Sequence, residues 1–161
     1  MIVRKAVKSD YDRIMAIYSS AREFMVKTGN PHQWCDLGYP YPDLIKEDIE
    51  EQRLLVITEN DMVEGVFFWA LGDDPTYVEI DGQWLNDKPY GVIHRIAGSG
   101  RVKGILKTAV DYCLKFCDNI KIDTHVDNIV MQNALKKLGF KYCGMVYLPH
   151  GVWMKAYQLS I

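Results

Sequence analysis

The spacing of apolar residues divides the chain into alternating helical and extended segments. Apolar residues recur every three or four positions over about 11–27, 42–52, 105–117 and 129–138, which predicts four amphipathic helices. Alternating or continuous apolar runs predict strands over 2–6, 54–58, 63–71, 77–80, 92–97, 120–123, 140–148 and 153–159. This order of elements predicts an α/β domain of the α+β type, built around one mixed sheet. No linker or internal repeat divides residues 1–161, so we expect one domain.

Composition and charge narrow the class of protein. The formal net charge is −2 and the pI is about 6.1, which argues against a nucleic-acid-binding protein. No apolar run is long enough to span a membrane, and the first residues lack the apolar core of a signal peptide, so we expect a cytoplasmic protein. The four cysteines are expected to be reduced core residues. Cys113 and Cys117 share a helix face, but no companion histidine supports a metal site, and none is expected.

Residues 91–108 hold the strongest chemical signal. An extended run leads into a loop that contains Gly98, Gly100 and Gly104, and a helical pattern follows directly. Glycines allow a backbone to approach a ligand closely, and the first N–H groups of a helix attract anions. The sequence has no acidic residue between Lys88 and Val110, while it has several cationic ones. These features predict a phosphate-binding loop.

Two common phosphate motifs do not fit this loop. The NTPase loop requires a glycine before Lys107-Thr108, and Leu106 occupies that position. The dinucleotide fingerprint requires a third glycine where Lys103 stands. The loop instead resembles the pyrophosphate loop of the GNAT-type N-acetyltransferase superfamily. That loop has Gln or Arg, then Gly three residues later, then Gly or Ala two residues further on. Here these positions are Arg101, Gly104 and Leu106, of which the last departs from the pattern.

A second motif supports the same resemblance. The family's following helix has Asn, then Ala or Met at +3, Tyr or Leu at +7, and Gly-Phe at +11 and +12. The chain has Asn128, Met131, Leu135 and Gly139-Phe140 at these positions. Two motifs, each in its required structural context, are more specific than either alone. The resemblance covers essentially the whole chain and implies a GNAT-like fold, layered α/β/α around one twisted mixed sheet.

The resemblance also implies acetyl-CoA as the cosubstrate and a direct transfer of its acetyl group to an amine. The main chains of Ile96 and Ala97 would bond the pantetheine arm, and Asn128 and Met131 would lie on its other side. The backbone N–H groups of Val102, Lys103, Gly104 and Ile105 would bind the pyrophosphate. The side chains of Arg101 and Lys103 would assist them. A purely structural interpretation is also open for both Asn128 and Met131: Asn128 would cap its helix, and Met131 would be a core residue.

The catalytic groups are less sharply indicated. Relatives with a glutamate base place it where this chain has Tyr90, and relatives with a tyrosine acid place it where this chain has Leu135. His94 stands on the cofactor strand, and histidine, with an ordinary pKa of about 6.5, suits a general base. A structural, hydrogen-bonded histidine is an equally open interpretation. Glu79 and Tyr147 are further candidates, and a thiolate with an ordinary pKa of about 8.5 can leave without a dedicated acid.

The acceptor is not specified by the sequence. Acidic residues cluster at 36–48 and 73–81, where they would attract a cationic amine if they line the cavity mouth. The aromatic and proline-rich segment 32–42 is expected to pack as a wall or lid. The leading hypothesis is an N-acetyltransferase for a small-molecule amine. The alternatives are a non-catalytic acyl-CoA sensor and a protein N-terminal or lysine acetyltransferase. We expect no nucleic acid or membrane partner, and a homodimer remains open.

Overall fold

One mixed sheet forms the centre of the structure, which is a computed structural model that describes residues 1–149 and 151–161. Its eight strands follow the order β1-β2-β3-β5-β6-β8-β7-β4. The strands are β1 (Ile2–Lys5), β2 (Leu54–Glu59), β3 (Met62–Leu71), β4 (Asp81–Gly82), β5 (Gly91–Gly98), β6 (Asn119–His125), β7 (Lys141–Tyr147) and β8 (Trp153–Ser160). The helices are α1 (Tyr11–Lys27), α2 (Pro42–Glu50), α3 (Ile105–Cys113) and α4 (Ile129–Lys137).

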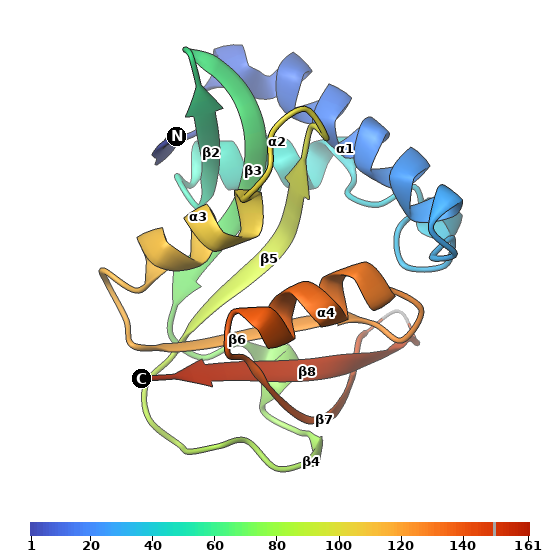
Figure 1. Cartoon of the computed structure of the whole chain (residues 1–161), viewed down its shortest axis with the longest axis vertical. Coiled ribbons are helices and arrows are strands. Elements are labelled where there is room, and N and C mark those ends of the chain that lie inside the picture. Colours follow the sequence, from blue (N-terminus) through green and yellow to red (C-terminus); the bar gives the residue numbers. More distant parts are fainter. Residues whose placement is uncertain (150) are drawn as a thin grey trace.

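The helices cover both faces of the sheet, in agreement with the predicted layered fold (Figure 1). On one face, Ile14 and Ile17 of α1 and Ile45 of α2 are at most 1% exposed and pack in one hydrophobic core. On the other face, Val110 of α3 and Leu135 of α4 belong to a second core. The mixed α/β sheet and all four predicted helices are therefore confirmed. Both faces of β2 are buried, which explains why its sequence is a continuous apolar run and does not alternate between apolar and polar residues.

The sheet divides at β5 and β6, the pair of neighbouring strands that run parallel. Their register contains just two residue pairs, Gly91 with Ile120 and Val92 with Lys121. Beyond Val92 the two strands diverge, so the later part of β5 has an open edge on the side of β6 (Figure 1). An open strand edge presents backbone donors and acceptors to a ligand. This divergence positions the candidate site.

Two segments differ from the sequence predictions. A strand was expected over 77–80, but Pro75–Tyr77 forms a 3-10 helix, and the Asp74 side chain accepts a hydrogen bond from the N–H of Thr76 at its start. Tyr77 is buried and Val78 is exposed, so burial alternates along this segment as it does in a strand, although the segment does not join the sheet. The third helix was expected to extend to about residue 117 and ends at Cys113.

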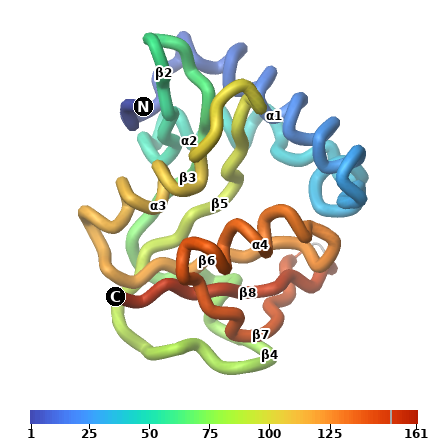
Figure 2. Tube along the Cα trace, in the orientation of Figure 1, coloured from blue at the N-terminus to red at the C-terminus, as the bar shows by residue number. Residues whose placement is uncertain are grey.

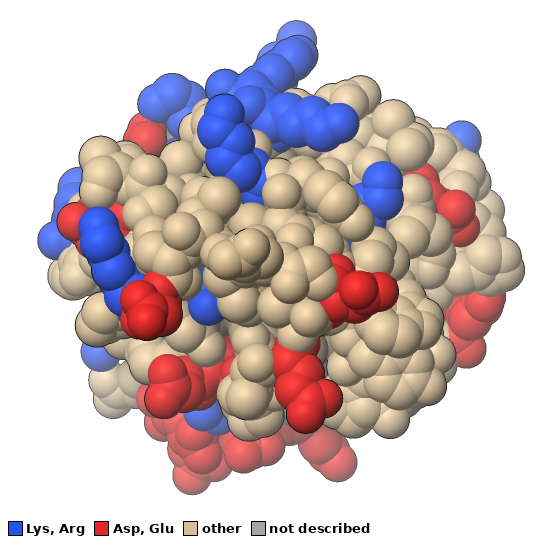
Figure 3. Space-filling model, turned by 90° about the horizontal axis from the view of Figure 1, so that it is seen from below, with Lys and Arg blue, Asp and Glu red and all other residues tan. Residues whose placement is uncertain are grey.

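Charge is distributed unevenly over the surface. On the face drawn in Figure 3, Lys and Arg gather along one edge and Asp and Glu along the opposite edge. Local fields, and not the small net charge, therefore decide which ligand each region attracts. The two termini lie on the same side of the molecule (Figure 2). Within the described residues no helix has the length and apolar character needed to cross a bilayer, and all four cysteines are free thiols.

Candidate functional site

A bulge in β5 shapes the centre of the site. Val66 of β3 pairs with Ala97 and Phe68 pairs with His94, so two residues of β5 lie opposite the single residue between them on β3. One of the two, Arg95, has a φ of 50°, which is costly for a residue other than glycine. Such strain persists where surrounding contacts enforce it, and it is common at functional sites.

The contacts that hold this bulge come from three parts of the chain. The Arg95 guanidinium donates to Asp48 Oδ2 from Nε (3.1 Å) and Nη2 (2.7 Å), and to the Tyr39 hydroxyl from Nη1 (3.1 Å). The Tyr18 hydroxyl donates to the Arg95 carbonyl at 2.8 Å. Asp48 is only 1% exposed, and this burial raises its pKa although Arg95 and Arg53 oppose the shift. Helices α1 and α2 and the segment between them therefore fix the backbone of β5.

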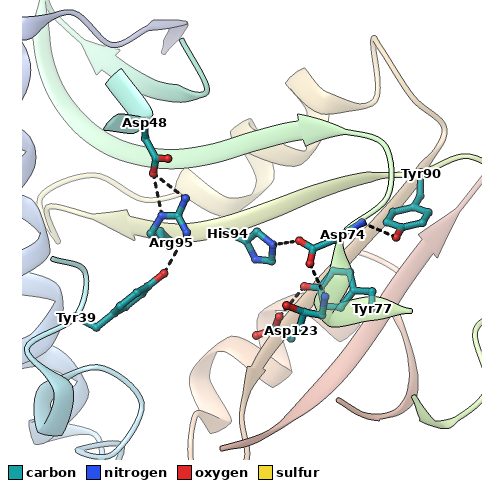
Figure 4. A network of polar contacts seen from close by, with 9 residues as sticks. Tyr39, Asp48, Asp74, Tyr77, Tyr90, His94, Arg95 and Asp123 are labelled. Atoms are coloured by element: carbon teal, nitrogen blue, oxygen red, sulfur yellow. Dashed lines mark hydrogen bonds and ion pairs between the residues drawn. The ribbon is translucent and has the colours of Figure 1, made fainter. Parts of the chain in front are cut away.

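His94 points away from Arg95 and forms a second network (Figure 4). Its Nε2 lies 2.6 Å from Asp74 Oδ2, and its ring lies between the rings of Phe68 and Tyr77, each with a centroid distance of 5.7 Å. The two polar side chains are 21% and 15% exposed, so solvent screens the pair only partly. When Nε2 carries the proton and donates it to Asp74, Nδ1 is left as an acceptor for another proton. This arrangement orients a histidine for general-base chemistry.

The Asp74 carboxylate is itself held in place. Its Oδ1 accepts from the N–H of Thr76 at 2.9 Å, and the Asp74 N–H donates to the Tyr90 hydroxyl at 3.0 Å. Burial by itself would raise the pKa of Asp74, but the hydrogen bonds from His94 and Thr76 outweigh burial and lower it. Asp74 therefore remains a carboxylate that can stabilise a protonated His94.

A tyrosine pairs with a further carboxylate beside this network. The Tyr77 hydroxyl donates to Asp123 Oδ2 at 2.6 Å. Burial first, and then the Asp123 charge, raise the pKa of Tyr77 well above its ordinary value. Tyr77 is therefore a poor source of a proton for a leaving group near neutral pH.

A cavity of about 430 Å³ opens in front of His94. It lies between the diverging strands β5 and β6 and the segment 33–39, which confirms that this irregular segment is a packed wall. Of the residues predicted from sequence, His94, Ile96, Asn128 and Met131 line it. A concave site with convergent polar groups is the usual form of a small-molecule site.

The predicted phosphate loop lies at the far end of β5 and fits an anionic group. Gly104 has a φ of 86° and precedes the first residue of α3, Ile105. The first-turn N–H groups of α3 have no acceptor within the helix, which makes them donors for an anion. A Cβ at Gly104 would meet no described atom except Met1 Cε at 3.6 Å within 4 Å, so the space beside this backbone is open to a ligand. Val102–Ile105 therefore suit a pyrophosphate, with the exposed Lys103 side chain beside them.

Arg101 is held by the protein itself. Its guanidinium forms an ion pair with Glu64 of β3, which is 5% exposed at its side chain and also accepts from the Ser99 hydroxyl. Its Nε donates to Glu64 Oε2 at 3.2 Å. The hydrogen bond from Arg101 is the largest influence on Glu64 and lowers its pKa. The family resemblance predicts that Arg101 assists the pyrophosphate. In this structure it ties the loop to β3, and its contact with a phosphate stays a prediction.

This anchor leads to a test of loop positioning. Glu64→Gln keeps the shape but removes the charge, so we expect several-fold weaker binding of CoA because the loop loses its tether to β3. Isothermal titration at two salt concentrations measures the effect, and Glu50→Gln, which removes an exposed charge on α2, serves as the control. Unchanged affinity in Glu64→Gln would show that the loop holds its conformation without Arg101.

Asn128 connects the site to the wall segment. Its Oδ1 accepts from the N–H of Met131 at 3.0 Å, so its expected role as a helix cap is confirmed. Its Nδ2 donates to Gln33 Oε1 at 2.9 Å. The bond to Gln33 joins α4 to the segment between α1 and α2 across the cavity. The pantetheine contact expected for Asn128 remains a prediction.

The other catalytic candidates lie apart from His94. Glu79 is exposed in the loop before β4 and does not line the cavity. Tyr147 is 54% exposed, and its ring packs at a tilt against Trp153 with centroids 5.0 Å apart. Leu135, at the position of the family's tyrosine, is fully buried in the core. These positions give no geometric support for Glu79 or Tyr147 as the base. No group of three or more His, Cys, Asp or Glu within the described ranges is arranged to hold a metal ion.

Comparisons with known proteins show which solved structures the chain resembles. The chain is 32% identical to an acetyltransferase of the GNAT family from Streptococcus agalactiae 2603, with a TM-score of 0.89 and 99% of this chain and 95% of that chain covered. It is 20% identical to a GNAT-family acetyltransferase from Listeria monocytogenes 4b F2365, with a TM-score of 0.71 and 99% and 94% covered. Neither a family model nor a curated protein sequence matches the chain.

The identity and coverage of the streptococcal structure establish the family. The chain belongs to the GNAT family of acetyltransferases. The same fold occurs in a NatC complex bound to Gag peptide and CoA, at 15% identity, with a TM-score of 0.62 and 99% of this chain and 98% of that chain covered. An acetyl-transfer function is therefore supported, while the acceptor is not specified by these relatives.

Proposed function

We propose that this protein is an acetyl-CoA-dependent N-acetyltransferase that transfers an acetyl group directly to the primary amine of a small molecule. The observation that carries the proposal is the His94–Asp74 pair. This pair faces a cavity beside the open edge of β5. The family membership supports acetyl transfer, and the pair supplies a base for the amine that must lose a proton.

The chain's own residues suit each part of this chemistry. Acetyl-CoA supplies the thioester when it is bound. The backbone of Ile96 on the open β5 edge would bond the pantetheine, and the Val102–Ile105 N–H groups would hold the pyrophosphate. His94 accepts the proton of the attacking amine, and Asp74 stabilises the resulting imidazolium. Because the leaving thiolate has an ordinary pKa of about 8.5, the chain needs no tyrosine at Leu135.

The wall segment favours a small acceptor over a protein. Trp34 is 6% exposed, and its ring packs on Tyr18 (5.8 Å between centroids) and Tyr39 (6.1 Å). Gln33 is tied to Asn128 across the cavity. This packed wall borders one side of the cavity and supports a small acceptor. A homodimer remains a prediction that these contacts do not address.

Ligand binding and turnover test the proposal together. At a hundredfold excess over the dissociation constant, acetyl-CoA should stabilise the fold by about 2.7 kcal/mol and raise Tm, while ATP and NAD should have little effect. Release of free thiol with a panel of small amines then measures transfer. The panel should include a peptide with a free N-terminus and a lysine side chain.

Each alternative has its own outcome in this experiment. A thermal shift without turnover of any amine or peptide would identify an acyl-CoA sensor. Turnover of the peptide alone would identify a protein acetyltransferase. No shift with millimolar acetyl-CoA would contradict the cosubstrate assignment.

A further inference from the structure

The charges of the cavity wall point to the kind of amine that it accepts. Four carboxylates line the cavity and two guanidinium groups oppose them, so with a neutral His94 the wall carries two more negative than positive charges. The carboxylates belong to Glu47, Asp48, Asp74 and Asp123, and the guanidinium groups belong to Arg53 and Arg95. A concave wall with an excess of one sign attracts ligands of the opposite sign.

Both guanidinium groups are already engaged by carboxylates of the protein. Arg95 donates two hydrogen bonds to Asp48, as described above. Arg53 Nη2 lies 2.6 Å from Glu51 Oε2 and 3.9 Å from Asp48 Oδ1. A carboxylate on the acceptor would have to displace one of these internal partners. The cavity is therefore poorly suited to an acidic acceptor.

Glu47 is the carboxylate best placed to meet a cation. It is exposed, it lies on α2 beside Asp48, and it lines the cavity. Among the residues that the structure describes, none forms an ion pair with Glu47 within 4.0 Å. Its neighbour Asp48 lies on the opposite side of His94 from Asp74 (Figure 4). The cavity therefore has one acidic region at the catalytic pair and a second one at α2.

The cavity also has apolar and aromatic lining residues, although the Arg95 guanidinium lies between Asp48 and His94 (Figure 4). The Phe68 ring lies beneath Arg95 at 4.6 Å, and Trp34, Leu37 and Leu44 also line the cavity. Apolar walls pack against methylene groups, and aromatic faces also tolerate nearby cations.

We infer that the acceptor carries two amino groups joined by an apolar spacer. One amino group is acetylated beside His94, and the other stays protonated against Glu47. The inference rests on the proposed function. The attacking amine must be neutral, so it cannot balance the acidic wall itself. A second amino group that stays protonated balances the negative charge of the wall, while the attacking amine remains neutral and nucleophilic.

Matched amines test the inference. α,ω-Diaminoalkanes of several lengths are compared with the monoamine and the ω-amino acid of the same carbon number, and thiol release with acetyl-CoA gives kcat/KM. We expect the best diamine to exceed its monoamine several-fold, because an exposed ion pair at a protein surface can supply up to about a fivefold difference. The ω-amino acid should be the poorest of the three. Added salt should narrow the gap between diamine and monoamine, because it screens the exposed Glu47.

A pair of variants on α2 locates the effect. Glu47→Gln should lower the ratio of diamine to monoamine kcat/KM several-fold. Glu50→Gln, which removes an exposed charge of the same helix that does not line the cavity, should leave the ratio unchanged. An unchanged ratio in Glu47→Gln would overturn the assignment of the second ammonium to this residue.

The outcomes separate this inference from the proposed function. Equal turnover of monoamines and diamines, or a preference for the ω-amino acid, would overturn the inference and leave the N-acetyltransferase assignment standing. If none of the small amines is acetylated, both the proposed function and the inference fail.

Discussion

His94→Ala should lower the turnover number by about a hundredfold or more, because a positioned general base contributes at least this factor. The affinity for CoA should stay nearly unchanged, since the phosphate loop lies at the other end of β5. The wild-type rate should fall as the pH decreases, because a protonated imidazole cannot accept the proton of the amine. The part of this acidic limb that belongs to His94 should be absent from the pH profile of the variant, while protonation of the amine itself still lowers the rate. Stopped-assay thiol release across pH 5–9, on protein shown to be folded, measures both effects.

Asp74→Asn provides the matched control, since it preserves the volume beside His94 and removes the charge. We expect a smaller loss of kcat than in His94→Ala, with the KM for acetyl-CoA unchanged. If His94 is only structural, His94→Ala should lower Tm and leave the turnover of the folded fraction intact.

The pH dependence of stability gives a separate check on Asp74. Its hydrogen bonds lower its pKa in the folded state. The stability that they contribute is present above the unfolded pKa and is lost as the pH falls through the folded pKa. Asp74→Asn should therefore reduce the part of the acid-induced loss of Tm that this carboxylate causes.

Gly104→Val should abolish measurable CoA binding, the second large effect that we expect. A branched side chain at this position would occupy the open space beside the loop backbone, where the pyrophosphate is expected. The φ of 86° adds strain of about 1–2 kcal/mol for any residue with a Cβ, so some loss of Tm is also expected. Isothermal titration with CoA on folded protein measures the loss of affinity.

Gly100→Ala separates obstruction from backbone strain. Gly100 has a similar φ of 82°, and a Cβ there would meet no described atom within 4 Å. Gly100→Ala should therefore reduce stability and leave most of the CoA affinity intact. If Gly104→Val binds CoA as tightly as the wild type, the pyrophosphate lies elsewhere.

Local sequence patterns were sufficient for the existence of the helices, for the loop between β5 and α3, and for one helix cap. The predicted helix over 11–27 coincides with α1 (Tyr11–Lys27), and Asn128 caps α4 as expected. These features depend on interactions between residues close in the chain, such as helical periodicity and the bond from the Met131 N–H to the Asn128 side chain. The strand predicted over 77–80 is wrong because the pattern there does not come from local interactions. There the burial of Tyr77 by distant residues, and not strand pairing, produces the alternation.

The sequence by itself determined the family motifs and the strand–loop–helix unit, and it singled out His94 as a candidate base. Only the tertiary structure decided what surrounds that histidine. Asp74 lies 20 residues before His94 and reaches it because β3 pairs with β5, with Phe68 opposite His94. Asp48 lies 47 residues before Arg95 and reaches it because α2 packs on the face of the sheet toward which the bulge turns Arg95. Side-chain pairs of this kind have no local signal, because they form only after long-range strand pairing and helix packing bring the elements together.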